Sequence, residues 1–192
     1  MSSPRIISGT AKGLRLKSVP GDSTRPITDR VKEALFNILG NDIQGSTFLD
    51  LFGGTGSVGI EALSRGAASA CFIEKNHSAF QVLKSNLVNC KVDQKAQAIM
   101  GDAFSYLHKK QPYAFDYIFI APPQYMGLWE KALLLVENNI SILSNDGWVI
   151  VQIHPVENKT IDLVHLELFD TRSYGSTLLL FYQPFLSDMP DG

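Results

Sequence analysis

Cysteine and histidine are scarce in this 192-residue chain, which has two cysteines and four histidines. Cys71 and Cys90 are too few and too poorly spaced for a disulfide framework or a zinc site. No two histidines stand at the i, i+4 spacing of paired metal ligands on a helix. We therefore predict no metal site, and two reduced, buried thiols of the kind found in a cytosol-like compartment.

Long hydrophobic runs are also missing. No uninterrupted apolar stretch approaches the roughly 18 residues that span a membrane, and residues 1–8 lack the pattern of a secretory signal. We expect no membrane partner and a cytoplasmic protein, with an organelle stroma or matrix left open. Because 45% of the residues are hydrophobic and the formal net charge is only −2, general disorder is excluded.

The small net charge hides an uneven distribution. Residues 1–34 contain seven basic and three acidic residues, a net charge of +4, whereas the other 158 residues contain ten basic and sixteen acidic ones, a net charge of −6. A basic arm on an acidic body is typical of a tethered element that binds phosphate groups. A solvated surface hairpin would carry the same charges, so this alternative stays open.

The first 41 residues predict an extension ahead of the main domain. Residues 5–8 and 14–19 are typical of two strands of a hairpin, and the second alternates apolar and basic side chains. A helix is predicted to begin at Thr28 or Asp29, with one apolar stripe, and to end at Gly40. We therefore divide the chain into an extension over 1–41 and a main domain over 42–192.

The main domain alternates strands with helices. Strands are predicted over residues 47–52, 69–74, 96–100, 115–120 and 147–153. Helices are predicted over residues 57–65, 78–89, 103–110 and 128–143. This repetition predicts a parallel α/β sheet with helices on both faces. Residues 165–172 and 175–182 form a predicted antiparallel pair that closes the sheet.

A glycine turn follows the first strand of this domain. Gly54-x-Gly56-x-x-Gly59 fits the dinucleotide-binding fingerprint, with Glu74 twenty residues further on. However, a carboxylate at Asp50, just before the turn, would repel a pyrophosphate and would suit a cofactor with a cationic amino end. S-adenosyl-L-methionine has such an end and carries no phosphate, so we interpret the turn as part of a site for this methyl donor.

Two more acids stand just beyond the next strand ends. Glu74 closes the second strand, where its carboxylate is able to accept two hydrogen bonds from a ribose diol. Asp102 follows the third strand, placed to accept a hydrogen bond from an adenine amino group, and it is equally a plausible helix N-cap. Three acids at successive strand ends favour one ligand site, because ligands bind at the carboxyl ends of such sheets.

These motifs resemble the class I S-adenosylmethionine-dependent methyltransferases, and more closely the RsmD-like family, whose members methylate the exocyclic amino group of one guanine in 16S ribosomal RNA. The likeness runs nearly end to end. It is carried by Arg5-Ile-Ile-Ser-Gly, Asp50-Leu-Phe-Gly-Gly-Thr-Gly, Ile60-Glu-Ala-Leu-Ser-Arg-Gly-Ala and Tyr174-Gly-Ser-Thr-Leu-Leu-Leu-Phe-Tyr. The most specific segment is Arg25-Pro-Ile-Thr-Asp-Arg-Val-Lys-Glu-Ala-Leu-Phe-Asn, which methyltransferases at large lack.

The resemblance implies a seven-stranded Rossmann-like methyltransferase sheet with a C-terminal antiparallel hairpin and an N-terminal β-hairpin extension that faces RNA. The residues that would contact the methyl donor are Asp50, Phe52, Gly54, Gly56, Glu74, Lys75, Asp102 and Ala103. Arg25, Thr28 and Arg30 would lie near the RNA or the mouth of the active site. Guanidinium groups suit phosphate contacts, although a salt-bridged helix start involving Asp29 is an alternative for the two arginines.

One departure from the family pattern concerns the residues that hold the target base. Members typically carry Asp or Asn, then Pro-Pro, then Phe or Tyr. The side chain of the Asp or Asn and the carbonyl of the first proline accept hydrogen bonds from the target amino group. The aromatic ring stacks on the base. Here the predicted catalytic stretch is Pro122, Pro123, Gln124 and Tyr125, preceded by Ala121. Ala121 has no side-chain acceptor, and the aromatic residue is displaced by one position.

Three consequences of Ala121 remain open. We favour the first, in which the Pro122 carbonyl suffices, with Gln124 or a neighbour as second acceptor and Tyr125 as the stacking platform. In the second, the methylated base or atom differs. In the third, the protein binds donor and RNA without transferring the methyl group.

The leading hypothesis is a monomeric RNA methyltransferase that acts on a guanine amino group in small-subunit ribosomal RNA or in a subunit assembly intermediate. The alternative from another class is a catalytically weak or silent RNA-binding or ribosome-assembly module. An NAD-dependent oxidoreductase fits the literal glycine fingerprint. A methyltransferase that acts on an asparagine or glutamine of a protein is a further possibility, since similar Pro-Pro turns serve amide nitrogens.

Overall fold

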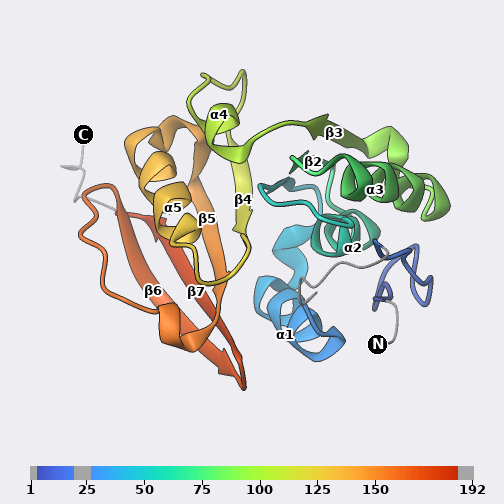
Figure 1. Ribbon diagram of the computed structural model, residues 1–192, viewed down its shortest axis with the longest axis horizontal. Helices are drawn as coiled ribbons and strands as arrows, with labels where there is room; N and C mark the ends of the chain where they lie inside the picture. The colour runs from blue at the N-terminus through green and yellow to red at the C-terminus, as the bar shows by residue number, and fades with distance from the viewer. Residues whose placement is uncertain (1–3, 20–26, 186–192) are drawn as a thin grey trace.

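The computed structural model describes residues 4–19 and 27–185, in which seven strands form one mixed sheet of order β3-β2-β1-β4-β5-β7-β6 (Figure 1). The strands are β1 (Thr47–Asp50), β2 (Ser69–Glu74), β3 (Ala96–Met100), β4 (Phe115–Ile120), β5 (Leu143–Ile153), β6 (Leu166–Tyr174) and β7 (Thr177–Pro184). Strands β1 to β5 pair in parallel, and β7 pairs antiparallel with both β5 and β6. The predicted α/β class with a C-terminal antiparallel hairpin is therefore confirmed.

Helices cover both faces of the sheet, as Figure 1 shows. The helices are α1 (Asp29–Leu39), α2 (Ser57–Ser64), α3 (His77–Asn89), α4 (Ala103–Leu107) and α5 (Leu128–Asn138), with short 3-10 turns at Gly40–Ile43, Asp93–Lys95, Ile140–Ile142 and Pro155–Glu157. Successive strand residues point to opposite faces, so Phe48 joins the core under α1, α2 and α3, whereas Leu49 joins the core under α4 and α5. No helix of the described residues has the length and apolarity to cross a membrane.

Two predicted helices are too long. The helix predicted over 128–143 ends at Asn138, and β5 begins at Leu143 instead of 147, because Asn139 leaves the helical region and Leu143 pairs with Phe115. The helix predicted over 103–110 ends at Leu107. There the side chain of Gln111 donates to the carbonyls of Tyr106 and Lys109, two groups that a longer helix would use itself.

The predicted N-terminal hairpin is present, but its two strands are reduced to one antiparallel bridge between Arg5 and Arg15. The backbone N–H of Ile6 donates to the carbonyl of Leu14 at 2.9 Å, which continues the pairing. Longer strands do not form, because the next N–H groups, those of residues 7 and 8, donate to a side chain of α2 instead.

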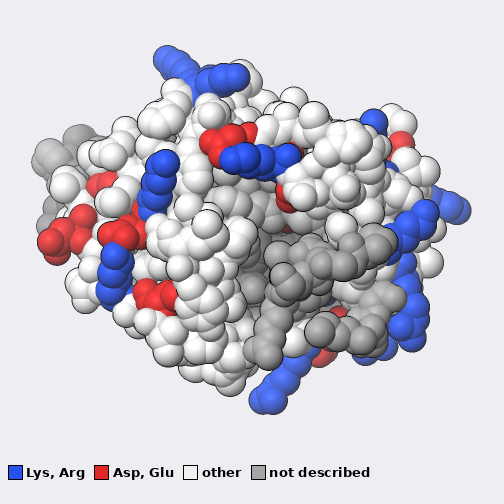
Figure 2. All heavy atoms as spheres, in the orientation of Figure 1, with Lys and Arg blue, Asp and Glu red and all other residues white. Residues whose placement is uncertain are grey.

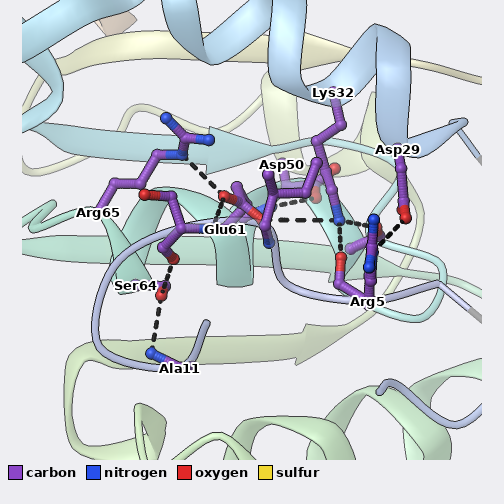
Figure 3. Close-up of polar contacts among 12 residues, drawn as sticks. Arg5, Ala11, Asp29, Lys32, Asp50, Glu61, Ser64 and Arg65 are labelled. Carbon is purple, nitrogen blue, oxygen red and sulfur yellow. Dashed lines mark hydrogen bonds and ion pairs between the residues drawn. The ribbon is translucent and has the colours of Figure 1, made fainter. Parts of the chain in front are cut away.

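A buried polar cluster fixes this hairpin to α1 and α2 (Figure 3). Glu61, fully buried in α2, accepts the N–H groups of Ile7 and Ser8 at 2.8 and 3.0 Å and the Arg65 Nε at 2.7 Å. The Lys32 Nζ, also fully buried, lies 3.7 Å from the Glu61 carboxylate and donates to the Arg5 carbonyl at 2.7 Å. Burial lowers the pKa of Lys32, so the nearby carboxylate is what keeps its charged form in place.

The hairpin also makes a close backbone contact with α2. The Ala11 N–H donates to the Ser64 hydroxyl at 2.9 Å. Gly9 has a φ of +82°, and a Cβ at this position would lie 1.7 Å from the Ser64 carbonyl oxygen. Only glycine fits there, so the sequence of the hairpin is matched to the surface of α2.

Candidate active site

The predicted site residues come together at the carboxyl edge of the parallel strands. Strand β1 ends at Asp50, β2 at Glu74, and Asp102 follows β3 by two residues. Strand β1 lies between β2 and β4, with Asp50 aligned with Phe72 and with Phe119. The chain order reverses between β1 and β4, and a crevice at this reversal is where open α/β sheets bind their ligands.

Asp50 is a buried carboxylate at the start of the glycine turn. The residue is 2% exposed, and its Oδ2 accepts the Gly59 N–H at 3.3 Å. Burial raises its pKa to about 7, the Gly59 N–H opposes this shift, and the charge of Glu74 adds to it. A cationic group placed beside Asp50 would favour the ionised form, so the environment suits an ammonium ligand.

Close packing explains the glycine spacing of the turn. A Cβ at Gly56 would lie 2.5 Å from the Leu83 Cδ1, and one at Gly59 would lie 2.2 Å from the Phe72 ring. A Cβ at Gly54, which has a φ of +51°, would meet only the Phe52 carbonyl oxygen, at 3.9 Å. Two of the three glycines are thus required for packing of α2, and Gly54 is the one that leaves bare backbone toward a ligand.

Glu74 connects the glycine turn to the end of β2. Its Oε2 accepts the Gly54 N–H at 2.8 Å, and its Oε1 accepts the Asn76 N–H at 2.6 Å. These two bonds fix the carboxylate at the crevice. A carboxylate has about four lone-pair sites, so two of them remain for the hydroxyl groups of a ribose.

Asp102 is the N-cap of α4. Its Oδ1 accepts the Ser105 N–H at 2.9 Å, a bond that is the largest cause of its lowered pKa. Its Oδ2 lies 3.8 Å from the Nζ of the exposed Lys75. The structure therefore confirms that Asp102 is a helix N-cap. A hydrogen bond from an adenine to the Oδ2 of Asp102 stays a prediction. Contacts of Lys75 and the buried Ala103 with the methyl donor also stay predictions.

An aromatic pair lies beside these acids. Phe52, which is predicted to contact the methyl donor, packs edge-on against Phe104 of α4, with ring centroids 6.1 Å apart. The Lys131 Nζ lies 4.3 Å from the centre of the Phe104 ring. Sequence reasoning did not select Phe104. Its position two residues after Asp102, on the helix that follows the third strand, was the available signal.

The Pro-Pro turn follows β4 at the same edge. Pro122 is buried, Pro123 is exposed and Gln124 is half-buried. Tyr125 is 65% exposed and has a φ of +63°, a left-handed conformation that is unusual for a residue with a side chain. The turn therefore presents an aromatic ring on a strained piece of backbone.

Two residues that sequence reasoning missed hold this conformation. The Tyr125 N–H donates to the Glu157 Oε1 at 2.8 Å, and the Tyr125 ring lies 5.6 Å from the His154 ring. Glu157 also accepts the His154 N–H at 3.4 Å, which closes a capping box on the short turn Pro155–Glu157. Histidine is not among the usual N-cap residues, and the contact of Glu157 with Tyr125 spans 32 residues, so the local sequence signalled neither.

Two of the three predicted RNA-facing residues, Thr28 and Arg30, lie at the start of α1. Thr28 is its N-cap and accepts the Val31 N–H at 3.3 Å, and Arg30 is exposed. Asp29 pairs with Arg5 at 2.7 Å. Arg25 lies outside the described residues. Figure 2 shows Lys and Arg side chains along the edge that carries the N-terminal hairpin in Figure 1, where residues 12, 15 and 17 are exposed basic residues.

Comparison with known proteins gives matches along nearly the whole chain. The family model "Conserved hypothetical protein 95" matches residues 4–183. The Bacillus subtilis protein YlbH is 40% identical over 182 residues, 93% of this chain and 98% of YlbH. The ribosomal RNA small subunit methyltransferase D of Escherichia coli is 40% identical over 145 residues, 76% of this chain and 69% of that protein.

A solved structure agrees with these sequence matches. The Escherichia coli protein yhhF superposes with a TM-score of 0.84 at 33% identity, over 94% of this chain and 97% of that chain. The resemblance noted in the sequence is thus confirmed by family model, sequence identity and fold together. The chain belongs to the Conserved hypothetical protein 95 family, the family of the RsmD ribosomal RNA methyltransferases.

Proposed function

We propose that this protein transfers the methyl group of S-adenosyl-L-methionine to the exocyclic amino group of a guanine in small-subunit ribosomal RNA. The observation that carries the proposal is the buried Asp50 carboxylate, whose pKa is raised to about 7, beside a glycine turn and the fixed Glu74. This arrangement offers a partner to a cationic amino acid end and to a ribose, and none to a pyrophosphate.

Within this proposal each acid has one task. Asp50 pairs with the donor's ammonium group, Glu74 accepts hydrogen bonds from the ribose hydroxyls, and Asp102 accepts one from the adenine amino group. S-adenosyl-L-methionine supplies an electrophilic methyl group on a sulfonium. The protein's residues supply the alignment, and orientation of two reactants alone is worth several orders of magnitude in rate.

The Pro-Pro turn would hold the target base. A guanine has to leave its helix stack to reach such a site. Tyr125 would stack on the base, and the Pro122 carbonyl would accept a hydrogen bond from the target amino group. The nitrogen lone pair then attacks the methyl carbon in line, the carbon–sulfur bond breaks, and the spare proton of the amino group passes to water.

A second candidate function is an RNA-binding or ribosome-assembly module that is catalytically silent. The observation in its favour is Ala121, which offers no side-chain acceptor where the family typically has Asp or Asn. This candidate predicts RNA binding that does not change in an Asp50→Ala variant, and no turnover.

Transfer of tritium-labelled methyl groups tests the proposal. Small-subunit RNA and assembly intermediates from cells that lack the protein are incubated with labelled donor, and the modified nucleoside is identified after digestion. The proposal predicts label in a guanine methylated at its exocyclic amino group. Label in another nucleoside would show that the protein methylates a different base. No label in any RNA would favour the catalytically silent RNA-binding module.

Donor binding is expected to weaken as the pH falls through 7. The pKa of Asp50 is raised from 3.8 to about 7, so at pH 5 roughly one molecule in a hundred carries the ionised form that attracts an ammonium group. Between pH 7 and pH 5 the affinity for S-adenosylhomocysteine should fall about 50-fold by calorimetry. An Asp50→Asn variant should lose most of this dependence; an equal slope in that variant would contradict the assignment.

Glu157→Ala is expected to impair catalysis more than folding. The change leaves the Tyr125 N–H without its acceptor and releases a backbone held at a φ of +63°. We expect kcat/KM for RNA to fall about 10-fold, equivalent to one hydrogen bond, with Tm nearly unchanged. Glu130→Ala is the matched control, because Glu130 pairs with Lys159 instead. Equal losses in both variants would contradict a specific role for Glu157.

A further inference from the structure

One buried polar atom in the described residues has no hydrogen-bond partner: the side-chain oxygen Oε1 of Gln152. Buried polar atoms in native proteins are almost always paired, so an orphan calls for an explanation. Gln152 lies in β5, one residue before the end of the strand at Ile153. It is therefore at the carboxyl edge of the sheet, the edge that carries the candidate active site.

Strand register places Gln152 beside Ala121. Strands β4 and β5 are parallel, with Phe119 opposite Ile150 and Ile120 opposite Val151. Continued by one residue, this register aligns Ala121 with Gln152. Because successive side chains alternate between faces, Gln152 shares a face with Ile150 and with Ala121, which packs against the same core.

The two cross-strand neighbours of Gln152 have no polar side-chain atom that could pair with its amide. On the β7 side it is paired with Leu179, a fully buried apolar residue. Ala121 on the β4 side has only a methyl group. The carboxamide of Gln152 therefore lies between two apolar side chains. It is directly beside residue 121, where the family pattern has an acid or an amide.

We propose that Gln152 supplies the hydrogen-bond acceptor that Ala121 lacks, with its Oε1 accepting from the target amino group of the RNA base. The inference rests on the proposed function. The orphaned oxygen gains its partner when the base enters. Because a flip of the terminal amide only exchanges its oxygen and nitrogen atoms, the amide is able to turn its oxygen toward the incoming amino group. The hydrogen-bond acceptor then lies on β5, at Gln152, instead of at residue 121 after β4.

Gln152→Leu tests the proposal, because leucine keeps most of the volume and removes the acceptor. We expect kcat to fall about 100-fold, the loss typical of one catalytic hydrogen bond, with the Kd for S-adenosylhomocysteine unchanged. The Tm should stay the same or rise, because an unpaired polar atom is removed. Gln183→Leu is the matched control; Gln183 bonds to Glu167 in the β6–β7 pair, away from the carboxyl end of β5.

A swap of the amide across the two strands gives a readout that a structural role would not move. Gln152→Ala should be as inactive as Gln152→Leu, and adding Ala121→Asn should restore kcat at least 10-fold. An active wild type with an equally active Gln152→Leu, or a loss that Ala121→Asn does not repair, would overturn the role of Gln152 alone. A wild type that transfers no methyl group to any RNA, while still binding S-adenosylhomocysteine, would overturn the proposed function and this inference together.

Discussion

Replacing Glu61 by alanine is expected to lower the free energy of unfolding by about 3–5 kcal/mol, the range found when one partner of a buried ion pair is removed. Glu61 and Lys32 are both fully buried, and their charged atoms lie 3.7 Å apart. Without Glu61, the Lys32 ammonium keeps two neutral hydrogen-bond acceptors among the described residues, the Arg5 carbonyl and the Ser57 hydroxyl. An uncompensated charge in the core is what makes this loss large.

The same change should release the N-terminal hairpin. Glu61 accepts the N–H groups of Ile7 and Ser8, which have no strand partner of their own. Urea denaturation measures the stability, and limited proteolysis measures exposure of residues 4–19. Glu33→Ala is the control, since Glu33 is an exposed acid next to Lys32 in α1. A Glu61→Ala protein within 1 kcal/mol of wild type and equally resistant to protease would contradict this account of the hairpin.

Asp50→Ala is expected to weaken the binding of S-adenosylhomocysteine about 30-fold or more, because truncation of one partner in a buried charge pair costs roughly 2–5 kcal/mol. Methyl transfer at limiting donor should fall at least as much. Asp50 is 2% exposed, so solvent screens its charge little beside the ligand's ammonium group. Calorimetry with Asp146→Asn, an exposed acid in β5, gives the comparison for a change of charge alone.

Asp50→Asn, which keeps an oxygen that can accept the Gly59 N–H, should not destabilise the unliganded protein at neutral pH. The pKa of Asp50 is raised in the folded state from 3.8 to about 7, so its stabilising contribution is full below pH 3.8 and is lost as the pH rises through 7. At pH 8 the buried charge opposes folding, and its removal should leave Tm equal or higher. A variant that binds the ligand normally, or that loses binding only because it unfolds, would contradict the assignment of Asp50.

The edge that carries the three acids was predictable from the sequence because it follows from strand periodicity. Once residues 47–52 and 69–74 are recognised as parallel strands, their carboxyl ends, with Asp50 and Glu74, must lie at the same edge. The structure ends the first strand two residues earlier than predicted, at Asp50. The helix end at Asn138 was not predictable in this way. The apolar residues that follow in Ile140–Ile142 and Leu143 continue a helical pattern, and only the pairing of Leu143 with Phe115 decides against it.

The contacts that position the site were harder to predict, because they join residues distant in sequence. Glu157 meets Tyr125 across 32 residues, and Glu61 meets Ile7 across 54. A charged residue in the middle of a helix reads as exposed, and nothing local indicates that Glu61 faces the core. The role proposed for Gln152 likewise depends on the register of β4 against β5, which places Gln152 beside Ala121.

Calorimetric titration of the wild-type protein with S-adenosylhomocysteine, and separately with NADH, tests most directly whether the acids at this edge form a nucleoside site for a methyl donor. The account predicts saturable one-to-one heat with the sulfur nucleoside in the micromolar range and none with the dinucleotide. Binding heat with NADH alone, or no binding heat with either compound at millimolar concentration, would contradict it.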